Sequence, residues 1–374
     1  MSTEENQEFV DISSSADIRS HSQKKSKKKL IVIKVICCLL SVLFLVGGVA
    51  SIVYYSTLNK FQYKDIDKGS AVGNQNAQTS TDPTDPEMLI IDNEDGNLLS
   101  DPYVLNIMLF GADQYGNQGL SDTMILLSID NRHEKIKMTS FLRDTYISIP
   151  GYYATKLNAA YSLGGAELSI ATIEANYGVQ IDRYAIVNFE TFKEIVDIMG
   201  GVDVELSQDE IYYINDQIAQ NGQSEYLPYD TQPGMVNLNG QQALWYTRNR
   251  GGYINGTEYG GSDWDRVERQ RKFLNAVIDE LKSSASITEI VQIVNAVGPN
   301  ITTNLKNSEI TTLVSGALTY LSYDIEQLSM PTDGTWSYGY NEAGSVILVN
   351  DWYRARYDLA KFIYEDSVAD NYYY

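Results

Sequence analysis

The stretch VLNIMLFGA at residues 104–112, with TMILLSI at 123–129 and KIKMTSFL at 135–142, decides the fold class. Runs of this length that are rich in Val, Ile, Leu, Met and Phe are typical of buried strands. The polar residues 130–134 between the second and third runs predict a hairpin or a short connection. The three runs therefore predict the centre of a β-sheet.

Helical patterns and further strands alternate after this centre. In residues 189–199, for example, Phe189, Phe192, Ile195, Val196 and Met199 fall on one helical face, and Gly200-Gly201 ends the pattern. Strands interleaved with helices predict one α/β domain, with a mixed central sheet covered by helices. The expected helices are 166–177, 189–199, 266–282, 287–297, 308–321 and 351–364, and the expected later strands are 202–206, 326–330 and 346–349.

An apolar run precedes this domain. Residues 35–53 (VICCLLSVLFLVGGVASIV) carry no charge, and a helix of nineteen residues at ~1.5 Å per residue spans a bilayer core of about 30 Å. Lysines precede the run and two tyrosines follow it, which predicts an anchor with the later residues outside the cell. A cleaved signal peptide is disfavoured because more than thirty mostly polar residues come first. The predicted parts are a disordered cytoplasmic tail at 1–34, a transmembrane signal-anchor helix at 35–55, a flexible extracellular linker at 56–87 and a catalytic domain at 88–374.

Composition excludes several classes of protein. The chain has a net charge of −21, and the residues after the apolar run alone carry −23, which disfavours nucleic acid as a partner. His21 and His133 are the only histidines, which nearly excludes a Ser-His-Asp or Cys-His apparatus and a multi-histidine zinc site. Cys37 and Cys38 both lie in the apolar run, so the predicted exterior lacks disulfides, as fits a bacterium with a single membrane.

The remaining candidates for chemistry are Arg, Lys and Asp residues near predicted strand ends and at the start of a helix. Arg266, Arg269 and Gln270 share one helical face, and Arg248 and Arg250 lie on one side of a segment that we expect to be extended. Two such rows can converge on a pyrophosphate, which guanidinium groups bind bidentately.

Carboxylates accompany these cations. Asp113 follows the first strand and Asp122 precedes the second, so the two could hold Mg²⁺ against phosphate oxygens. The alternative is a structural salt-bridge network, and the spacing alone leaves both interpretations open. Its members would be Arg143, Asp144, Asp265 and Arg266.

Several motifs in this order resemble those of the LytR-CpsA-Psr family. They span residues 106–270, behind one predicted transmembrane helix, which is also typical of the family. The motifs are NIMLFGAD at 106–113, SDTM at 121–124, SFLRD at 140–144, KLNAAY at 156–161, YAIVNF at 184–189, IVDIMGGV at 195–202, LNGQQALWYTRNR at 238–250 and DRVERQ at 265–270.

The resemblance implies a phosphotransferase. Such an enzyme moves a glycopolymer (teichoic acid, capsule or a related polysaccharide) from undecaprenyl pyrophosphate to peptidoglycan through a phosphodiester, with Mg²⁺, or Mn²⁺ in its place. It implies that Asp113 and Asp122 organise the metal and that Asp122 or Asp144 takes the acceptor proton. The pyrophosphate-binding residues that it implies are Arg143, Lys156, Arg248, Arg250, Arg266 and Gln270, with Arg143 also counted among the catalytic residues.

Some questions stay open at this stage. Residues 251–265 are longer than is usual in the family, and Leu120 stands where a polar or basic residue is common, so the polymer is not specified. The apolar faces of 166–177 and 189–199 are candidates for a lipid tunnel, beside ordinary core packing. The alternative functions are a polyprenyl-pyrophosphate or glycan-binding regulatory protein without turnover, and a glycoside hydrolase, which would need two facing carboxylates instead of clustered arginines.

Overall fold

The computed structural model describes residues 61–66, 98–112, 121–254, 257–259, 263–284 and 287–365. The predicted tail and anchor lie outside these residues. Within the ranges that are described, no helix is both long enough and apolar enough to cross a membrane.

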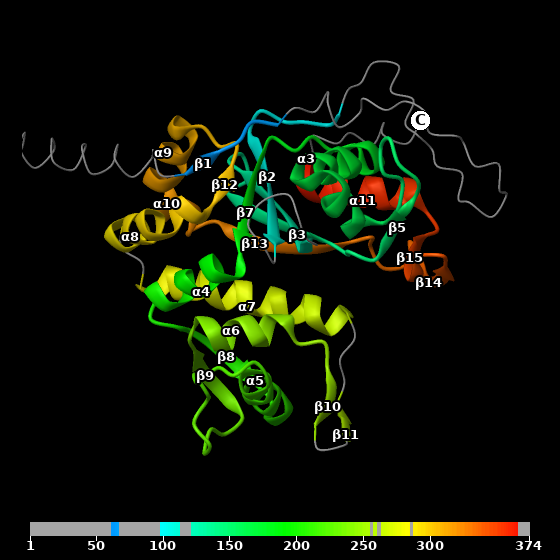
Figure 1. Cartoon of the computed structure of the whole chain (residues 1–374). Coiled ribbons are helices and arrows are strands. Elements are labelled where there is room, and N and C mark those ends of the chain that lie inside the picture. The colour runs from blue at the N-terminus through cyan, green and yellow to red at the C-terminus, as the bar shows by residue number, and fades with distance from the viewer. Residues whose placement is uncertain are drawn as a thin grey trace, which may run out of the picture. The chain divides into compact units, whose positions relative to one another are not determined.

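A mixed sheet forms the centre of the described molecule, which confirms the predicted fold class (Figure 1). The strand order is β1-β12-β7-β2-β3-β4-β13, with parallel pairs β1–β12, β7–β2 and β4–β13 and antiparallel pairs elsewhere. The strands are β1 (Gln62–Tyr63), β2 (Val104–Ala112), β3 (Ser121–Asp130), β4 (Lys135–Phe141), β7 (Arg183–Asn188), β12 (Thr302–Thr303) and β13 (Asp324–Met330).

The alternation along β2 assigns its side chains to two cores. Met108 and Phe110 face the main core, where α3 (Leu157–Tyr177) and α11 (Trp352–Tyr364) cover the sheet. Ile107 and Leu109 face the opposite side, where they pack with Leu313 of α9 (Asn307–Ser315). Because β2 is covered on both faces, it reads in the sequence as a nearly continuous apolar run.

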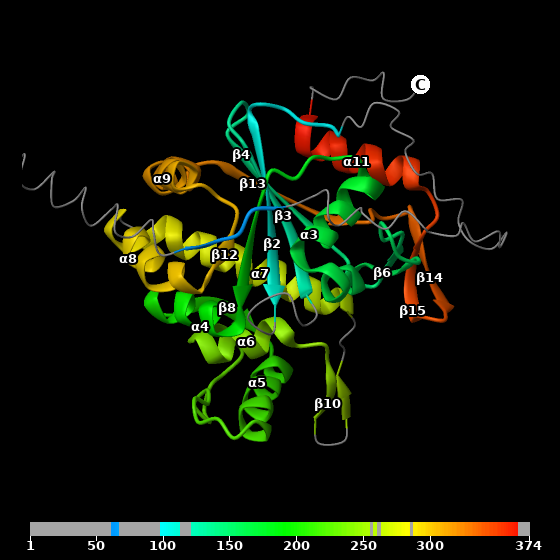
Figure 2. The same cartoon turned by 45° about the horizontal axis from the view of Figure 1, so that its top comes forward.

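A second layer lies beyond the end of the sheet and has a core of its own (Figure 2). Val204, Ile214, Leu238, Tyr246 and Phe273 are among its buried members. The elements of this layer are α4 (Phe189–Ile198), β8 (Val202–Leu206), α5 (Gln208–Gln220), β9 (Gly234–Leu238), α6 (Gly240–Arg248) and α7 (Asp263–Ser284).

A small sheet of order β14-β15-β5-β6 flanks the main sheet. Its strands are β5 (Thr145–Ile147), β6 (Thr155–Lys156), β14 (Trp336–Asn341) and β15 (Gly344–Val349). The segment after Arg250, where we noted extra length, forms the hairpin of β10 (Gly252–Ile254) and β11 (Thr257–Tyr259).

The structure departs from the sequence predictions in several places. Gln62 and Tyr63 lie in the segment predicted as a linker, yet they extend the main sheet, with Phe61 against Gly298. The helix expected at 166–177 is the second segment of α3, and the structure adds an unpredicted first segment from Leu157, separated from it by the non-helical dihedral angles of Gly164 and Gly165. The helix expected over 308–321 divides at Gly316 into α9 and α10 (Ala317–Tyr320), and α8 (Ile287–Val297) precedes them.

Candidate functional site

A cavity of about 620 Å³ lies between the sheet and the second layer. Its walls are mostly apolar and come from β2, β3, α4, α6 and α7. The apolar lining includes Leu109, Phe110, Ile125, Phe189, Phe192, Ile195, Val196, Leu244, Trp245, Phe273, Leu274 and Val277.

Four of the predicted pyrophosphate-binding residues line this same cavity. They are Arg248, the last residue of α6, Arg250, which comes two residues later, and Arg266 and Gln270 in the first turns of α7. The structure therefore brings the two rows together at one cavity, apart from Arg269, which does not line it. An apolar chamber with three guanidinium groups in its wall suits a molecule that has a hydrophobic chain and an anionic head.

The prediction of an extended segment at Arg248 and Arg250 is wrong in part. Asn239 caps α6 by accepting a hydrogen bond from the backbone N–H of Gln242, and the side chain of Gln242 bonds back to Asn239. This reciprocal cap starts a helix that continues through Arg248, and only Asn249 is extended. Both arginines still line the cavity.

Aromatic rings hold the guanidinium of Arg248. Its central carbon lies 4.5 Å from the centre of the Phe189 ring and 5.3 Å from that of Trp245. Such stacking fixes the plane of a guanidinium and leaves its edge N–H groups available to an anion.

Two side chains of α7 connect this helix to β3, α5 and the end of α6. Gln270 donates hydrogen bonds to Thr123 Oγ1 at 3.2 Å and to the carbonyl of Thr247 at 3.4 Å. Arg269 pairs with Glu210 at 2.7 Å and donates to the carbonyl of Asn249, the residue between the two cavity arginines. Arg269 thus holds the end of α6, whereas Arg266, only 2% exposed, lines the cavity itself.

A second charged group comprises Arg143, Asp144 and Lys156. One carboxylate oxygen of Asp144 lies 3.0 Å from Lys156 Nζ and the other lies 3.5 Å from Arg143 Nε. The contact of Asp144 with Arg143 belongs to the salt-bridge network that the sequence offered as an alternative, and Lys156 is an additional partner. The group adjoins the cavity residues, because Leu142 and Val267, the neighbours of Arg143 and Arg266, pack in one cluster.

The two predicted metal ligands lie at the border of the described residues. Asp113 is outside them, as is the side chain of Asp122. The backbone register pairs Gly111 with Thr123 and Ala112 with Ser121, so residue 122 is the extra residue of a β-bulge. Gly111 and Thr123 line the cavity; in the sequence, Asp113 comes two positions after Gly111 and Asp122 one position before Thr123.

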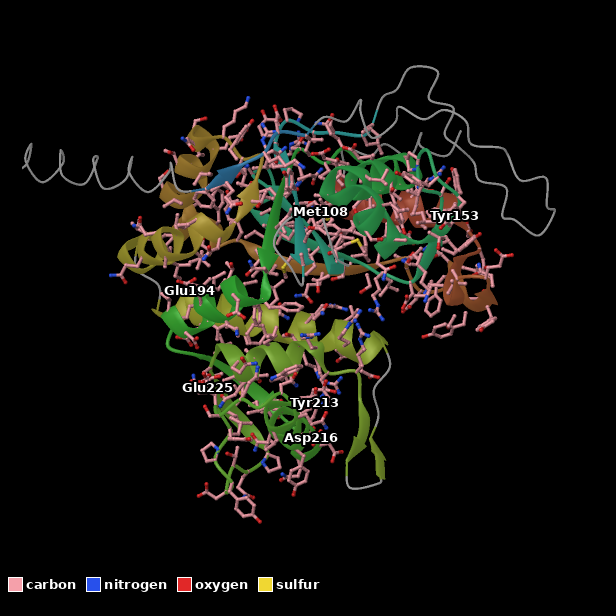
Figure 3. The ribbon with its side chains drawn as sticks, in the orientation of Figure 1. Met108, Tyr153, Glu194, Tyr213, Asp216 and Glu225 are labelled. Atoms are coloured by element: carbon pink, nitrogen blue, oxygen red, sulfur yellow. The ribbon has the colours of Figure 1, made fainter. Side chains whose placement is uncertain are left out.

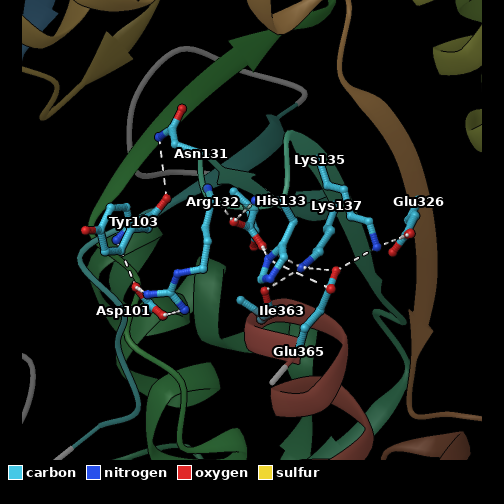
Figure 4. Close-up of polar contacts among 12 residues, drawn as sticks. Asp101, Tyr103, Asn131, Arg132, His133, Lys135, Lys137, Glu326, Ile363 and Glu365 are labelled. Atoms are coloured by element: carbon cyan, nitrogen blue, oxygen red, sulfur yellow. Dashed lines mark hydrogen bonds and ion pairs between the residues drawn. The ribbon is translucent and has the colours of Figure 1, made fainter. Parts of the chain in front are cut away.

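A different cluster of acidic and histidine side chains lies at the other end of β3 (Figure 4). Asp130, His133 and Glu365 have ligand atoms within 4.8 Å of one another. Lys137 already occupies this space, since its ammonium lies 2.9 Å from both Asp130 and Glu365. Burial raises the pKa of Asp130, but hydrogen bonds from His133 and Lys137 outweigh it and lower the pKa to about 2. We therefore assign a structural ion-pair network there.

Sequence reasoning missed several wall residues of the cavity. Tyr213 of α5 lies below α6 (Figure 3), where burial raises its pKa and the charges of Arg248 and Arg250 oppose that rise. Of the two tunnel candidates, the apolar face of 189–199 lines the cavity through Phe189, Phe192, Ile195 and Val196. The other candidate is wrong, because Ile170, Ile173 and Tyr177 lie in the main core.

The family profile that matches residues 63–349 is that of the LytR_cpsA_psr family. The chain belongs to this family. A polyisoprenyl-teichoic acid–peptidoglycan teichoic acid transferase TagU of Oceanobacillus iheyensis is 33% identical over 281 residues, which cover 72% of this chain and 80% of the relative.

Two solved structures of the LytR-CpsA-Psr kind have the same fold. Bacillus subtilis TagV is 26% identical with a TM-score of 0.53, over 71% of this chain and 98% of its own. The protein YwtF (TagT) with bound octaprenyl pyrophosphate lipid is 22% identical with a TM-score of 0.52, over 71% of this chain and 93% of its own.

Proposed function

We propose that this protein is a phosphotransferase that moves a glycopolymer from undecaprenyl pyrophosphate to peptidoglycan and releases undecaprenyl phosphate. The observation that carries the proposal is the apolar cavity in whose wall Arg248, Arg250 and Arg266 meet. A polyprenyl chain needs an apolar chamber, and its pyrophosphate needs cations at one end of that chamber. The relatives named as teichoic acid transferases support the same reaction class.

The described side chains suit distinct roles in this reaction. Arg248, Arg250, Arg266 and Gln270 bind the pyrophosphate from the cavity side, and Arg143 and Lys156 bind it from the second charged group. Asp144 orients Arg143 and Lys156 through its two ion pairs. Asp113 and Asp122 would hold Mg²⁺, or Mn²⁺, because carboxylates are the ligands that such ions prefer, and the ion would neutralise phosphate charge.

The chemical step is an in-line displacement at phosphorus. A hydroxyl of the peptidoglycan attacks the phosphorus that bears the sugar, and a new P–O bond forms. The bond from that phosphorus to the bridging oxygen breaks, and undecaprenyl phosphate leaves with the electron pair. The hydroxyl proton passes to Asp122 or Asp144. Positioning and charge neutralisation by the arginines supply most of the acceleration, as in other phosphoryl transfers.

The topology belongs to the same proposal. Residues 35–55 anchor the chain in the plasma membrane as one helix, with the N-terminus in the cytoplasm and the catalytic domain outside. A lipid-linked donor and a wall acceptor meet on that side of the membrane. The polymer is an anionic teichoic acid or a capsular polysaccharide, and the assay below distinguishes them by the saccharide supplied.

A transfer assay tests the proposal on the full chain in detergent. The mixture contains a synthetic polyprenyl-pyrophosphate-linked saccharide, peptidoglycan oligomers and Mg²⁺, and mass spectrometry follows released polyprenyl phosphate and sugar captured on peptidoglycan. We expect capture by the wild type and its loss in Arg143→Ala and Asp122→Ala. Tight donor binding without transfer, for every saccharide supplied, would indicate a regulatory binding protein instead of an enzyme.

A further inference from the structure

Three aromatic side chains alternate along β14, the edge strand of the small sheet. Trp336, Tyr338 and Tyr340 stand at every second position, so they project from one face of the strand. The exposed fractions of Tyr338 and Tyr340 are 62% and 86%. The ring of Trp336 meets that of Tyr338 edge-on, with centres 5.0 Å apart. We call Trp336, Tyr338 and Tyr340 the aromatic row.

The inner end of the aromatic row packs beside the sequence neighbours of two site residues. Trp336 packs against the cluster of Leu142, Val267 and Ile347. Leu142 directly precedes Arg143, and Val267 directly follows Arg266, so Trp336 adjoins both charged groups. From there β14 leads outward, on the side of the molecule that also carries the β10–β11 hairpin (Figures 1 and 2).

The strand beneath the aromatic row is well fixed. β14 pairs with β15 along its whole length, with Tyr338 opposite Ile347 and Tyr340 opposite Ser345. Gly339, between the two tyrosines, allows the close approach of Leu348, whose Cδ1 would lie 2.4 Å from an added Cβ. The backbone under the exposed rings is thus held in place, and a fixed row binds with little loss of conformational entropy.

The chemistry of the aromatic row suits sugar rings. A pyranose has a face of C–H groups that packs flat on an aromatic ring, while its hydroxyls stay hydrated or bond to Tyr OH. No Lys or Arg occurs in β14, and Asp333 and Glu342 flank the strand. A phosphate-rich polymer or an anionic bilayer needs positive charge at its contact surface, which this strand does not provide.

We propose that the aromatic row is the binding subsite for the glycan strand of the peptidoglycan acceptor. It would hold sugar rings next to the one whose hydroxyl faces the pyrophosphate. This assignment rests on the proposed function, since that function defines which glycan is the acceptor. The row extends the site from the reacting phosphorus to neighbouring sugars and so favours a polymeric acceptor over a single disaccharide.

Direct binding tests the aromatic row without any transfer. The full chain in detergent is titrated by calorimetry with soluble peptidoglycan glycan strands freed of their peptides. We expect Tyr338→Ala and Tyr340→Ala each to weaken binding about 10-fold, and the double variant more, because each loses one stacked ring. Tyr338→Phe keeps the ring and should stay near the wild type. Tyr229→Ala, which changes a fully exposed tyrosine of the second layer, is the matched control.

The transfer assay gives the second readout. We expect the double variant to raise the KM for the acceptor strand about 10-fold or more, with the KM for the lipid donor and the kcat at saturation unchanged. Unchanged strand binding in the double variant would overturn the assignment, as would an equal loss of binding to poly(glycerol phosphate) or to anionic vesicles. If the double variant loses strand binding while the wild type shows no transfer, the aromatic row is kept as the glycan subsite and the proposed reaction is rejected. If the wild type transfers and the double variant has an unaltered acceptor KM, the reaction is kept and the subsite is rejected.

Discussion

In the proposed site, anion binding by Arg248 depends on the shape of its guanidinium as well as on its charge. The group stacks on Phe189 and Trp245, at 4.5 and 5.3 Å from their centres, so a lysine would keep the charge but lose the stacked plane and the paired N–H groups. We expect Arg248→Lys to weaken binding of a fluorescent polyprenyl pyrophosphate about 10-fold or more. Arg354→Lys, at an exposed arginine paired with Asp358, is the control. Equal affinity in both variants would show that Arg248 acts only as a point charge.

Local sequence predicts some of the residue contacts in the site but not others. Spacing on a helix was enough to place Arg266 and Gln270 together, because i and i+4 share a face. The stacking of Arg248 on Phe189 joins residues about sixty positions apart, and no local pattern reports such a contact. The ion pair between Asp144 and Lys156 likewise depends on the pairing of β5 with β6, whereas Arg143 is the sequence neighbour of Asp144.

At the scale of elements, α6 is the helix on which the cavity arginines depend. Gly240, its first residue, lies so close to α4 that an added Cβ would be 2.3 Å from the carbonyl oxygen of Lys193. Its N–H donates to Asp197 at 2.7 Å. An alanine normally stabilises a helix by about 1 kcal/mol relative to glycine. Here the backbone clash reverses the sign, and we expect Gly240→Ala to cost about 2 kcal/mol or more.

Urea unfolding of the full chain in detergent measures this difference. Asn239→Ala is the comparison, since it removes only the cap of α6 and should cost about 1 kcal/mol. We also expect Gly240→Ala to weaken donor binding, because α6 ends at Arg248. A higher midpoint for Gly240→Ala than for the wild type would contradict the close packing of α6 on α4.

There are physical reasons why the sequence predicts some elements and not others. The apolar spacing of 104–112, 123–129 and 135–142 located the central strands, since burial there is on both faces. For α6 the sequence does carry a helix signal, because Asn239 is followed by Gln242 and an apolar run, but the i, i+2 spacing of Arg248 and Arg250 favours an extended segment. β12 and β1 contribute two residues each to the sheet, too few for any pattern to form.

At the scale of the whole molecule, a buried network joins the β3–β4 turn to the last described residue, Glu365. Lys137 of β4 is fully buried and contacts Asp130 and Glu365, so it ties the β3–β4 turn to the residue after α11. We expect Asp130→Asn to lower the free energy of unfolding by about 3 kcal/mol, because it removes a carboxylate from a buried ammonium. Glu268→Gln, which disrupts an exposed pair with Lys272, should change it by less than about 0.5 kcal/mol. Donor binding by folded Asp130→Asn should stay at the wild-type value.

The same network predicts how stability depends on acidity. Burial raises the pKa of Asp130, but the hydrogen bonds from His133 and Lys137 lower it from 3.8 to about 2, and the pKa of Glu365 is lowered as well by its bonds to Lys135 and Lys137. A carboxylate with a depressed folded-state pKa stabilises the fold above its unfolded pKa and loses that contribution as the pH falls through the folded value. The difference in unfolding free energy between the wild type and Asp130→Asn should therefore be full above about pH 4 and shrink toward pH 2. Urea titrations of both proteins from pH 6 to pH 2 measure it, and a difference that stays constant over this range would mean that the ionisation of Asp130 does not stabilise the contact between the β3–β4 turn and Glu365.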